Sequence, residues 1–311
     1  MNIVEIKDLV KYYGDFKALD HLSLTLKENE VLGLLGPNGS GKTTTINCLL
    51  SLLNYDEGTI TVFNKQMSPS SYDIKKDIGL VMQNVAVFDE LTVYQNIDYF
   101  CGLYIRDKKR RKMLVEEALD FVGLKEFMKK KPKQLSGGLL RRLNIACGIA
   151  HKPKLIILDE PTVAVDPQSR NHILENIIKL NEQGATIIYT THYMEEAEQI
   201  CSRIVIMDSG KVIASGSKDE LIDLIDIQEI ITFKIKEINN ELLSKLNDDK
   251  RIIDVKYKDH ILTLNCGKSE NMLFNMISLM KDYNVIIDEV YTEKPTLNDV
   301  FLKITGKELR D

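Results

Sequence analysis

Hydrophobic and polar residues alternate in the first part of the chain. Residues 2–10 and 18–26 follow this two-residue period, which predicts strands with one buried face. Residues 30–35 form a short apolar run and predict a third strand. In residues 44–53 the apolar side chains recur on one face of a predicted helix. We therefore expect the N-terminal strands to lead into a strand, a loop and a helix.

The middle of the chain predicts further buried strands and a helical region. Strands are expected at residues 78–82, 155–158 and 186–191, and the continuous apolar run at 155–158 is typical of a parallel sheet covered on both faces. Residues 56–64 read as turn, strand and turn. Between these strands, helices are expected at residues 93–103, 106–121 and 137–150. The pattern indicates an α/β fold with a helical subdomain at about 88–150.

The last third of the chain predicts a separate α+β unit. Residues 217–220 form a capping box that opens a short helix to about residue 227. A strand, a helix, two strands, a helix and a strand follow, at residues 230–235, 240–246, 252–257, 261–266, 270–283 and 285–291. This order is the ferredoxin-like split unit. Residues 295–306 predict a final helix with a hydrophobic docking face. We expect domains at 1–217 and 218–311, the second with a regulatory or dimer-stabilising role.

Composition narrows the possible classes of protein. The 311 residues are 44% hydrophobic and 28% charged, as in ordinary globular chains, and the net charge of −5 gives no reason to expect nucleic-acid binding. No apolar run approaches the roughly 18 residues of a membrane helix, and the N-terminus does not resemble a secretory signal. Basic runs at 108–112 and 129–131 are expected to be mainly solvated, with anionic lipid or an acidic partner as the alternatives. The scattered cysteines predict buried unpaired thiols rather than a zinc or redox site: Cys48, Cys101, Cys147, Cys201 and Cys266.

The loop between the third strand and the first helix matches the phosphate-binding pattern G-x-x-x-x-G-K-[ST]. Its glycines allow the backbone to turn tightly and direct N–H groups inward, and the following helix adds a positive N-terminus. Lys42 is expected to reach the β- and γ-phosphates, and the Thr43 hydroxyl to bind Mg²⁺. A chance match in a glycine-rich turn is the alternative, which the flanking strand and helix oppose. The loop residues are Gly36, Pro37, Asn38, Gly39, Ser40, Gly41, Lys42, Thr43 and Thr44.

Polar residues follow three of the predicted buried strands. Asp159 and Glu160 end the 155–158 strand, where Asp159 suits a Mg²⁺ ligand and Glu160 suits a base that orients a water for attack on phosphorus. His192 follows the 186–191 strand and is expected to contact the γ-phosphate. Gln83 follows the 78–82 strand, at the sheet edge where ligands bind in open α/β folds, and is expected to serve catalysis and to bind Mg²⁺, although a solvated loop residue is the alternative.

Two further features could contact a nucleotide. Ser136, Gly137 and Gly138 precede a long helix and suggest a second anion site, with a plain helix start as the alternative. Tyr13, just before Gly14, could stack on a nucleobase, although an aromatic residue at a turn more often serves packing.

The order of these parts resembles the ATP-binding subunits of ABC transporters over residues 1–217. The resemblance implies a phosphate-loop NTPase core with an antiparallel β subdomain and the helical subdomain, and Mg²⁺-dependent ATP hydrolysis. It also implies a head-to-tail dimer in which ATP lies between one subunit's phosphate loop and the other's signature. The motifs are Tyr13, the phosphate loop, Gln83, the signature Leu135-Ser136-Gly137-Gly138, Asp159 with Glu160, Asp166 and His192.

The resemblance also implies partners for this chain. The expected partners are a second ATP-binding subunit and a separate transmembrane permease. The chain would then lie at the cytoplasmic face of the membrane, with membrane contact only through the permease. Residues 191–197 and the tail resemble the ABC-2 branch, which energises exporters of drugs, polysaccharides, lipids or sodium. An importer subunit is the alternative within transporters.

The sequence departs from the family pattern at two places. Leu139 stands where the signature usually continues with Gln, and Ala164-Val165 stands where Gly-Leu usually precedes Asp166. Neither change removes a phosphate ligand, a metal ligand or the base, so hydrolysis is still expected. A soluble ABC protein of translation or DNA maintenance is another hypothesis, opposed by the single phosphate loop and the absence of a coiled-coil run in the sequence. A non-hydrolysing regulatory module is opposed by the Asp159–Glu160 pair.

Overall fold

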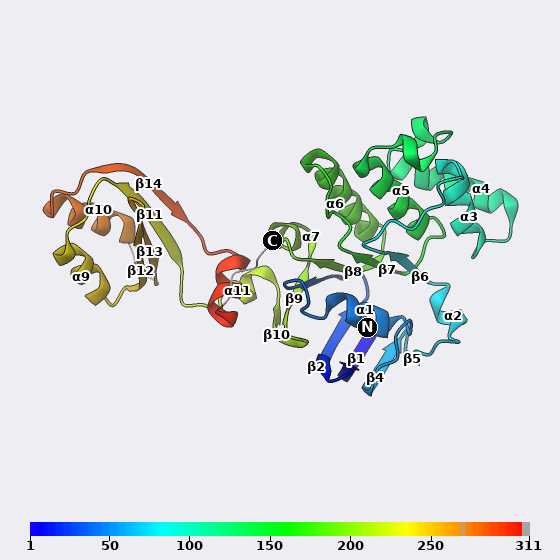
Figure 1. The fold of residues 1–311 in the computed structure, drawn as a ribbon, viewed down its shortest axis with the longest axis horizontal. Coiled ribbons are helices and arrows are strands. Elements are labelled where there is room, and N and C mark those ends of the chain that lie inside the picture. The colour runs from blue at the N-terminus through cyan, green and yellow to red at the C-terminus, as the bar shows by residue number, and fades with distance from the viewer. Residues whose placement is uncertain (268, 270, 307–311) are drawn as a thin grey trace. The chain divides into compact units, whose positions relative to one another are not determined.

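The computed structural model describes residues 1–267, 269 and 271–306, and the chain divides into two compact units. Residues 1–218 belong to the first unit and residues 219–306 to the second. Figure 1 shows the elements of each unit along the chain.

The first unit is built on a six-stranded sheet with the order β10-β9-β3-β8-β7-β6. The five strands from β9 to β6 are parallel, and β10 pairs antiparallel with β9. Every residue of β3, β7 and β8 is buried, which confirms the strands predicted from these runs. The strands are β3 (Val31–Leu35), β6 (Ile78–Val81), β7 (Leu155–Asp159), β8 (Thr186–Thr191), β9 (Arg203–Asp208) and β10 (Lys211–Gly216).

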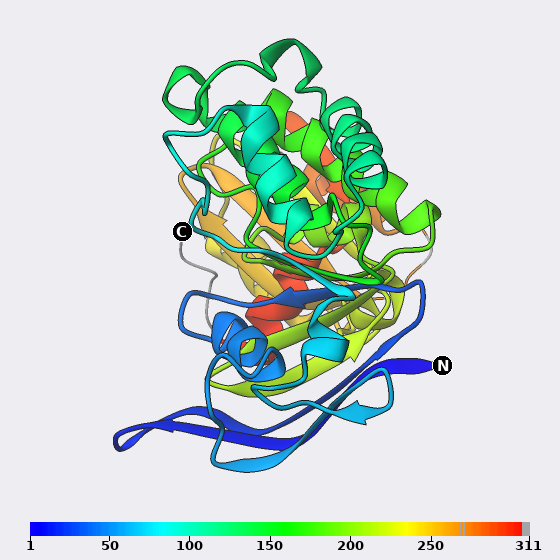
Figure 2. The same ribbon diagram turned by 90° about the vertical axis from the view of Figure 1, so that its right-hand side faces the viewer.

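Alternate residues of the central strands enter two different hydrophobic cores. In β7, Ile156 and Leu158 pack with the helices, whereas Leu155 and Ile157 pack with the antiparallel strands. This follows from the two-residue period of a strand, which sends successive side chains to opposite faces of the sheet. Figure 2 shows the antiparallel strands and the helical subdomain on opposite sides of the central sheet. The continuous apolar run in β7 is thus explained by burial on both faces.

A second sheet in this unit is antiparallel, as the family resemblance implied. Its order is β2-β1-β4-β5, formed by β1 (Asn2–Tyr13), β2 (Phe16–Lys27), β4 (Glu57–Val62) and β5 (Lys65–Gln66). The first strand extends beyond the predicted residues 2–10, because β1 continues to Tyr13, which pairs with Phe16. The turn itself is Gly14 and Asp15, with Gly14 at a φ of 58°.

Helices cover the sheet as predicted, with small shifts at their ends. The helix after the phosphate loop starts and ends earlier than expected, and the second helix of the helical subdomain starts later because Asp107 caps it. The helices of this unit are α1 (Lys42–Leu49), α2 (Tyr72–Lys75), α3 (Val93–Gly102), α4 (Lys108–Phe121), α5 (Gly137–Ile149), α6 (Pro167–Glu182) and α7 (Met194–Ile200), with short 3₁₀ turns at Lys125–Phe127 and Pro132–Gln134. The sequence prediction did not assign α6, although Asp166 before Pro167 is a strong helix start.

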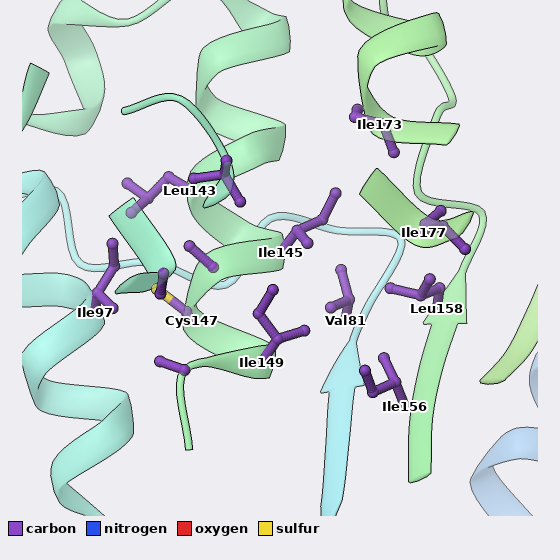
Figure 3. Close-up of a cluster of buried hydrophobic side chains, with 14 of the residues drawn as sticks. Val81, Ile97, Leu143, Ile145, Cys147, Ile149, Ile156, Leu158, Ile173 and Ile177 are labelled. Carbon is purple, nitrogen blue, oxygen red and sulfur yellow. The ribbon is translucent and has the colours of Figure 1, made fainter. Parts of the chain in front are cut away.

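Helix α5 packs closely against β6, as Figure 3 shows for the side chains around Val81. A Cβ atom on Gly148 would lie 2.7 Å from Val81 Cγ2 and 2.9 Å from the Leu80 carbonyl oxygen. A Cβ on Gly79 would lie 2.4 Å from the Gly148 carbonyl oxygen. Gly79 on β6 and Gly148 on α5 therefore allow the strand and the helix to approach closely.

Replacing Gly148 with alanine is expected to destabilise the first unit. Overpacking of this kind costs about 1–3 kcal/mol, and the better helix propensity of alanine returns only part of it, about 1 kcal/mol. Gly102→Ala is the matched control, because its Cβ would meet only the flexible Arg111 side chain, at 3.3 Å. Thermal unfolding measures both variants. An unchanged or raised Tm for Gly148→Ala would contradict the close packing.

The second unit has the predicted β-α-β-β-α-β order. Its sheet has the order β12-β13-β11-β14 with all neighbours antiparallel, which is the ferredoxin-like topology. The capped helix at its start ends at Ile222, before the expected residue 227, and the last strand starts at Ile287 rather than Val285, because Val285 N–H bonds the Met280 carbonyl at the end of α10. The predicted helix start at residue 270 lies outside the described residues. The elements are α8 (Lys218–Ile222), β11 (Glu229–Ile235), α9 (Asn240–Asp248), β12 (Ile252–Lys258), β13 (Ile261–Cys266), α10 (Met272–Asp282), β14 (Ile287–Glu293) and α11 (Leu297–Thr305).

Candidate active site

The phosphate loop connects β3 to α1 and is held between β9 and β2. A Cβ atom on Gly36 would lie 2.3 Å from the Met207 carbonyl oxygen, so only glycine passes this point without a clash. Gly41 caps α1 with a φ of 104°, a left-handed conformation that glycine adopts readily. Its Cβ would lie 2.8 Å from Leu19 Cδ2. The two glycines therefore fix the path of the loop.

Lys42 is the first residue of α1 and is only 4% exposed. Its Nζ donates to the carbonyls of Gly36 at 2.7 Å and Pro37 at 3.2 Å, and lies 3.5 Å from Glu160 Oε1. Burial lowers the pKa of Lys42, although the Glu160 and Asp159 carboxylates oppose this by raising it. A buried ammonium group is stabilised by anionic oxygens, so the position suits a phosphate group.

The loop also contains a polar atom that fits a ligand. Among the described residues, the buried Ser40 Oγ has no hydrogen-bond partner. Buried hydroxyl groups normally have one, so an unpaired hydroxyl beside the Lys42 ammonium agrees with a phosphate-binding loop. No residue of the described part of the chain belongs to a cluster of three or more metal-ligating side chains. Mg²⁺ is commonly bound through one or two carboxylates together with substrate phosphates.

Asp159 lies at the end of β7 with its carboxylate between two hydroxyl groups. Thr43 Oγ1 donates to Asp159 Oδ2 at 3.0 Å, and Thr190 Oγ1 donates to Asp159 Oδ1 at 2.6 Å. A carboxylate and a hydroxyl at the start of α1 form a set of hard oxygen donors of the kind that Mg²⁺ prefers. The structure thus brings together the predicted metal-binding residues Thr43 and Asp159.

Glu160 follows directly and is the point where three parts of the site meet. Its Oε2 accepts from Gln83 Nε2 at 3.0 Å, and its Oε1 lies 3.5 Å from both Lys42 Nζ and His192 Nδ1. The Glu160 backbone has a φ of 46°, and its N–H donates to Thr190 Oγ1 at 2.9 Å. Strained backbone of this kind is concentrated at functional sites. Parallel strands end at one edge of the sheet, which explains why these residues converge.

His192 is available for a further contact. Its Nδ1 is buried and has no hydrogen-bond partner among the described residues, since the 3.5 Å distance to Glu160 is an ion-pair approach only. The preceding Thr191 is tied to Glu196, a buried carboxylate on α7 that also accepts from Tyr189 and Thr162. This network fixes the backbone that leads into His192.

The signature residues form a second cluster, away from the hydrogen bonds of the phosphate loop. Ser136 caps α5, and its Oγ accepts from Leu139 N–H at 3.3 Å. A Cβ on Gly138 would lie 2.2 Å from Ser169 Oγ and 3.1 Å from Asp166 Oδ2. Asp166 caps α6 by accepting from Ser169 N–H at 2.9 Å, which lowers the pKa of Asp166. The signature and the Asp166 loop therefore lie together.

The two departures from the family pattern have structural settings. Leu139, in place of the usual Gln, is half-buried and packs against the core of the helical subdomain. Ala164 adopts a φ of 58°, a conformation that costs an alanine more than the usual glycine.

Tyr13 lies at the end of β1 and is 50% exposed, with Lys11 Nζ 5.8 Å above its ring. The paired strand β2 touches the phosphate loop at Ala18, whose carbonyl oxygen lies 3.1 Å from the Cβ position of Gly41. The exposed Tyr13 ring thus lies on a hairpin that borders the phosphate loop.

Thr190 is a site residue that no sequence pattern indicated. It bonds both acidic residues, but a threonine in a buried strand carries no signal of its own.

Known proteins resemble this chain over the residues that form the site. A family model described as "ABC transporter" matches residues 19–163. The chain is 37% identical to the linearmycin resistance ATP-binding protein LnrL of Bacillus subtilis (strain 168), over 99% of this chain and 100% of that protein. The chain belongs to the ABC transporter ATP-binding subunits. The family prediction is confirmed, and ATP hydrolysis is general to this family.

Two further similarities agree with this ABC subunit assignment. The chain is 35% identical to the Nod factor export ATP-binding protein I of Sinorhizobium fredii (strain NBRC 101917 / NGR234), over 99% of this chain and 87% of that protein. A solved dimeric structure of the ATP-binding cassette MJ0796, in a post-hydrolysis state with ADP and Pi, is 30% identical with a TM-score of 0.63. The match covers 69% of this chain and 98% of that chain. The predicted ABC ATPase fold class is therefore confirmed.

Proposed function

We propose that this subunit hydrolyses ATP with Mg²⁺ and thereby powers a separate transmembrane permease in export. The observation that carries the proposal is the position of Glu160, whose carboxylate is bonded by Gln83 and lies 3.5 Å from both Lys42 and His192. A carboxylate held at this position can orient a water and accept its proton.

The other residues would hold the nucleotide. Lys42 and the loop N–H groups bind the β- and γ-phosphates, and Tyr13 stacks on the base. Thr43 and Asp159, with Gln83 as a further candidate ligand, would hold Mg²⁺, and the bound ion would supply charge neutralisation at the phosphates. His192 contacts the γ-phosphate through a ring nitrogen. Each role is a proposal that this geometry supports.

The second cluster supports a head-to-tail dimer. Ser136 and Gly138 lie at the N-terminus of α5, where a helix attracts anions, yet their hydrogen bonds and close contacts are with α5 and the start of α6. We infer that they serve the nucleotide bound to the phosphate loop of a second subunit. The dimeric state of the similar cassette MJ0796 agrees with this arrangement.

The export direction rests on the extent of the similarity. The match to the linearmycin resistance protein covers both units of this chain, and so does the match to the Nod factor export protein. An importer subunit remains the alternative. A separate transmembrane permease is proposed as the partner, with this subunit peripheral at the cytoplasmic face, as the family resemblance implies. None of the helices in the described part of the chain has the length and apolarity of a membrane span. The second unit, residues 218–311, is proposed as regulatory or dimer-stabilising.

Phosphate release by the purified subunit tests the proposal. We expect release from ATP with Mg²⁺, loss of release with excess EDTA, and recovery when Mg²⁺ is restored, because the Thr43 hydroxyl is neutral and the Asp159 carboxylate is negative, so a bound cation is needed there to neutralise the phosphates. The assay is repeated in inside-out vesicles that contain a candidate permease, where export would appear as ATP-dependent uptake of the transported substrate. Absence of hydrolysis in both settings would contradict the proposed function.

A further inference from the structure

Arg141 lies in the second turn of α5, the helix that Ser136 begins, and is 6% exposed. Its Nη1 donates to the Gln83 carbonyl at 2.7 Å and to the Met82 carbonyl at 3.2 Å. These two residues follow β6 and lead into the loop that carries the Gln83 amide. The guanidinium group therefore holds the backbone at Met82 and Gln83 by hydrogen bonds, next to the Gln83 side chain of the proposed site.

Asn144, one helical turn after Arg141, makes further hydrogen bonds to the same loop. Its Nδ2 donates to the Met82 carbonyl at 3.2 Å, and its Oδ1 accepts from Ala86 N–H at 3.1 Å. Two side chains of α5 thus hold the loop at both ends of the segment from residue 82 to residue 86. Since hydrogen bonds from a cation to carbonyls are stronger than neutral ones, Arg141 is the principal contact.

The setting of Arg141 indicates a specific role rather than ordinary ion pairing. Within the described residues it makes no salt bridge to a carboxylate, so its buried charge is balanced by backbone carbonyls. Burial lowers the pKa of Arg141, which shows that the site is desolvated. A buried charge of this kind is costly unless its hydrogen bonds are made. The contact with the Gln83 carbonyl is therefore an energetic constraint on the loop.

Helix α5 is also fixed to β6 at its other end, where Gly148 approaches the Leu80 carbonyl and Val81. Contacts at Gly148, Asn144 and Arg141 therefore join α5 to β6 and to the loop that follows it. The N-terminus of α5 carries Ser136. The loop after β6 carries the Gln83 side chain, which donates to Glu160 Oε2 at 3.0 Å.

We propose that Arg141 is a positioning residue that holds Gln83 against Glu160 and ties this contact to the helix whose N-terminus carries Ser136. The inference rests on the proposed function, since it gives Glu160 the role of base. It adds that the helix serving the nucleotide of a second subunit also sets the geometry of hydrolysis in its own subunit.

Arg141→Met tests this inference by removing the donors while retaining a long apolar stem. We expect kcat for ATP to fall by about 10–100-fold, the usual effect of misplacing a catalytic group by about 1 Å, whereas KM for ATP stays within about twofold. Arg141→Lys is expected to recover part of kcat, because it restores one cationic donor. Arg142→Met is the matched control, since the neighbouring Arg142 donates instead to the Val122 carbonyl, at 3.4 Å, within the helical subdomain.

A double-mutant cycle separates positioning from general stability. In the Gln83→Ala background, Arg141→Met should cause little further loss of kcat, because its effect passes through Gln83. An equal loss in both backgrounds would overturn the inference, and so would a loss of the same size in Arg142→Met. Activities are normalised to the folded fraction from thermal unfolding, and Arg141→Lys supplies the test if Arg141→Met does not fold.

The control for the underlying function is Glu160→Gln in the same assay. If the native subunit hydrolyses ATP, Glu160→Gln is inactive and Arg141→Met retains the native kcat, the inference about Arg141 is wrong and the proposed function stands. If Glu160→Gln also retains the native kcat, Glu160 is not the base and the inference loses its premise. If the native subunit hydrolyses no ATP, with or without the permease, the proposed function itself is wrong.

Discussion

Glu160→Gln is expected to slow ATP turnover by about 10²–10⁴-fold, the usual contribution of a general base, with ATP binding intact. The amide cannot accept a proton from water, but it keeps the size of the side chain beside Lys42 and His192. Because hydrolysis no longer separates the subunits, an ATP-bound dimer should accumulate in the variant. Phosphate release, ATP calorimetry and analytical ultracentrifugation measure the three effects.

Glu195→Gln is the matched control for this prediction. Glu195 lies on α7 three residues after His192 and is exposed, so turnover should stay near the native value. Near-native hydrolysis by Glu160→Gln would remove Glu160 from the role of base. A simultaneous loss of ATP affinity would point instead to a collapse of the site around Lys42.

A mixture of Lys42→Ala and Ser136→Arg subunits is expected to recover ATP-dependent dimers that neither variant forms alone. Lys42→Ala removes the buried ammonium that faces the phosphates, so ATP affinity should drop sharply. Ser136→Arg should leave ATP binding by the monomeric variant nearly unchanged, but it should abolish dimerisation. In a head-to-tail pair, one shared site then collects both defects and the other has neither, so the mixed dimer keeps one intact site.

The mixing experiment is best made with Glu160→Gln in both subunits, where hydrolysis cannot dissolve the dimer. Ultracentrifugation with ATP and Mg²⁺ should show the mixed dimer, and Lys76→Ala, a change at an exposed lysine, should dimerise as the parent does. If no mixed dimer forms, with or without the permease, the shared-site arrangement is refuted. Repeating the test with the permease controls for a weak isolated dimer caused by Leu139.

Local patterns were sufficient for much of the fold. The strand, loop and helix around Lys42 follow from an apolar run, a glycine pattern and a helical period, all within about twenty residues. The ferredoxin-like unit was predicted in the same way, from alternating strands and two amphipathic helices. Helix ends were less accurate, as at Asp107, because caps depend on one side chain and one backbone N–H.

The convergence of Gln83, Glu160 and His192 could also be predicted, because parallel strands end at one edge of a sheet and each residue directly follows a buried strand. The sequence therefore determined the elements, the order of the motifs and the edge at which the acidic pair lies.

Only the tertiary structure decided how these residues are held. Thr190 links Asp159 to the Glu160 backbone, and Arg141 reaches the Gln83 carbonyl across 58 positions of sequence. The Thr190 contacts depend on the pairing of β7 with β8, and the Arg141 contact depends on the packing of α5 against β6. Neither pairing has a period in the sequence. For the same reason the approach of Gly138 to Asp166 could not be derived from the sequence. Periodicity reports which face of an element is buried, whereas the partner of each buried polar group is fixed only when the elements pack.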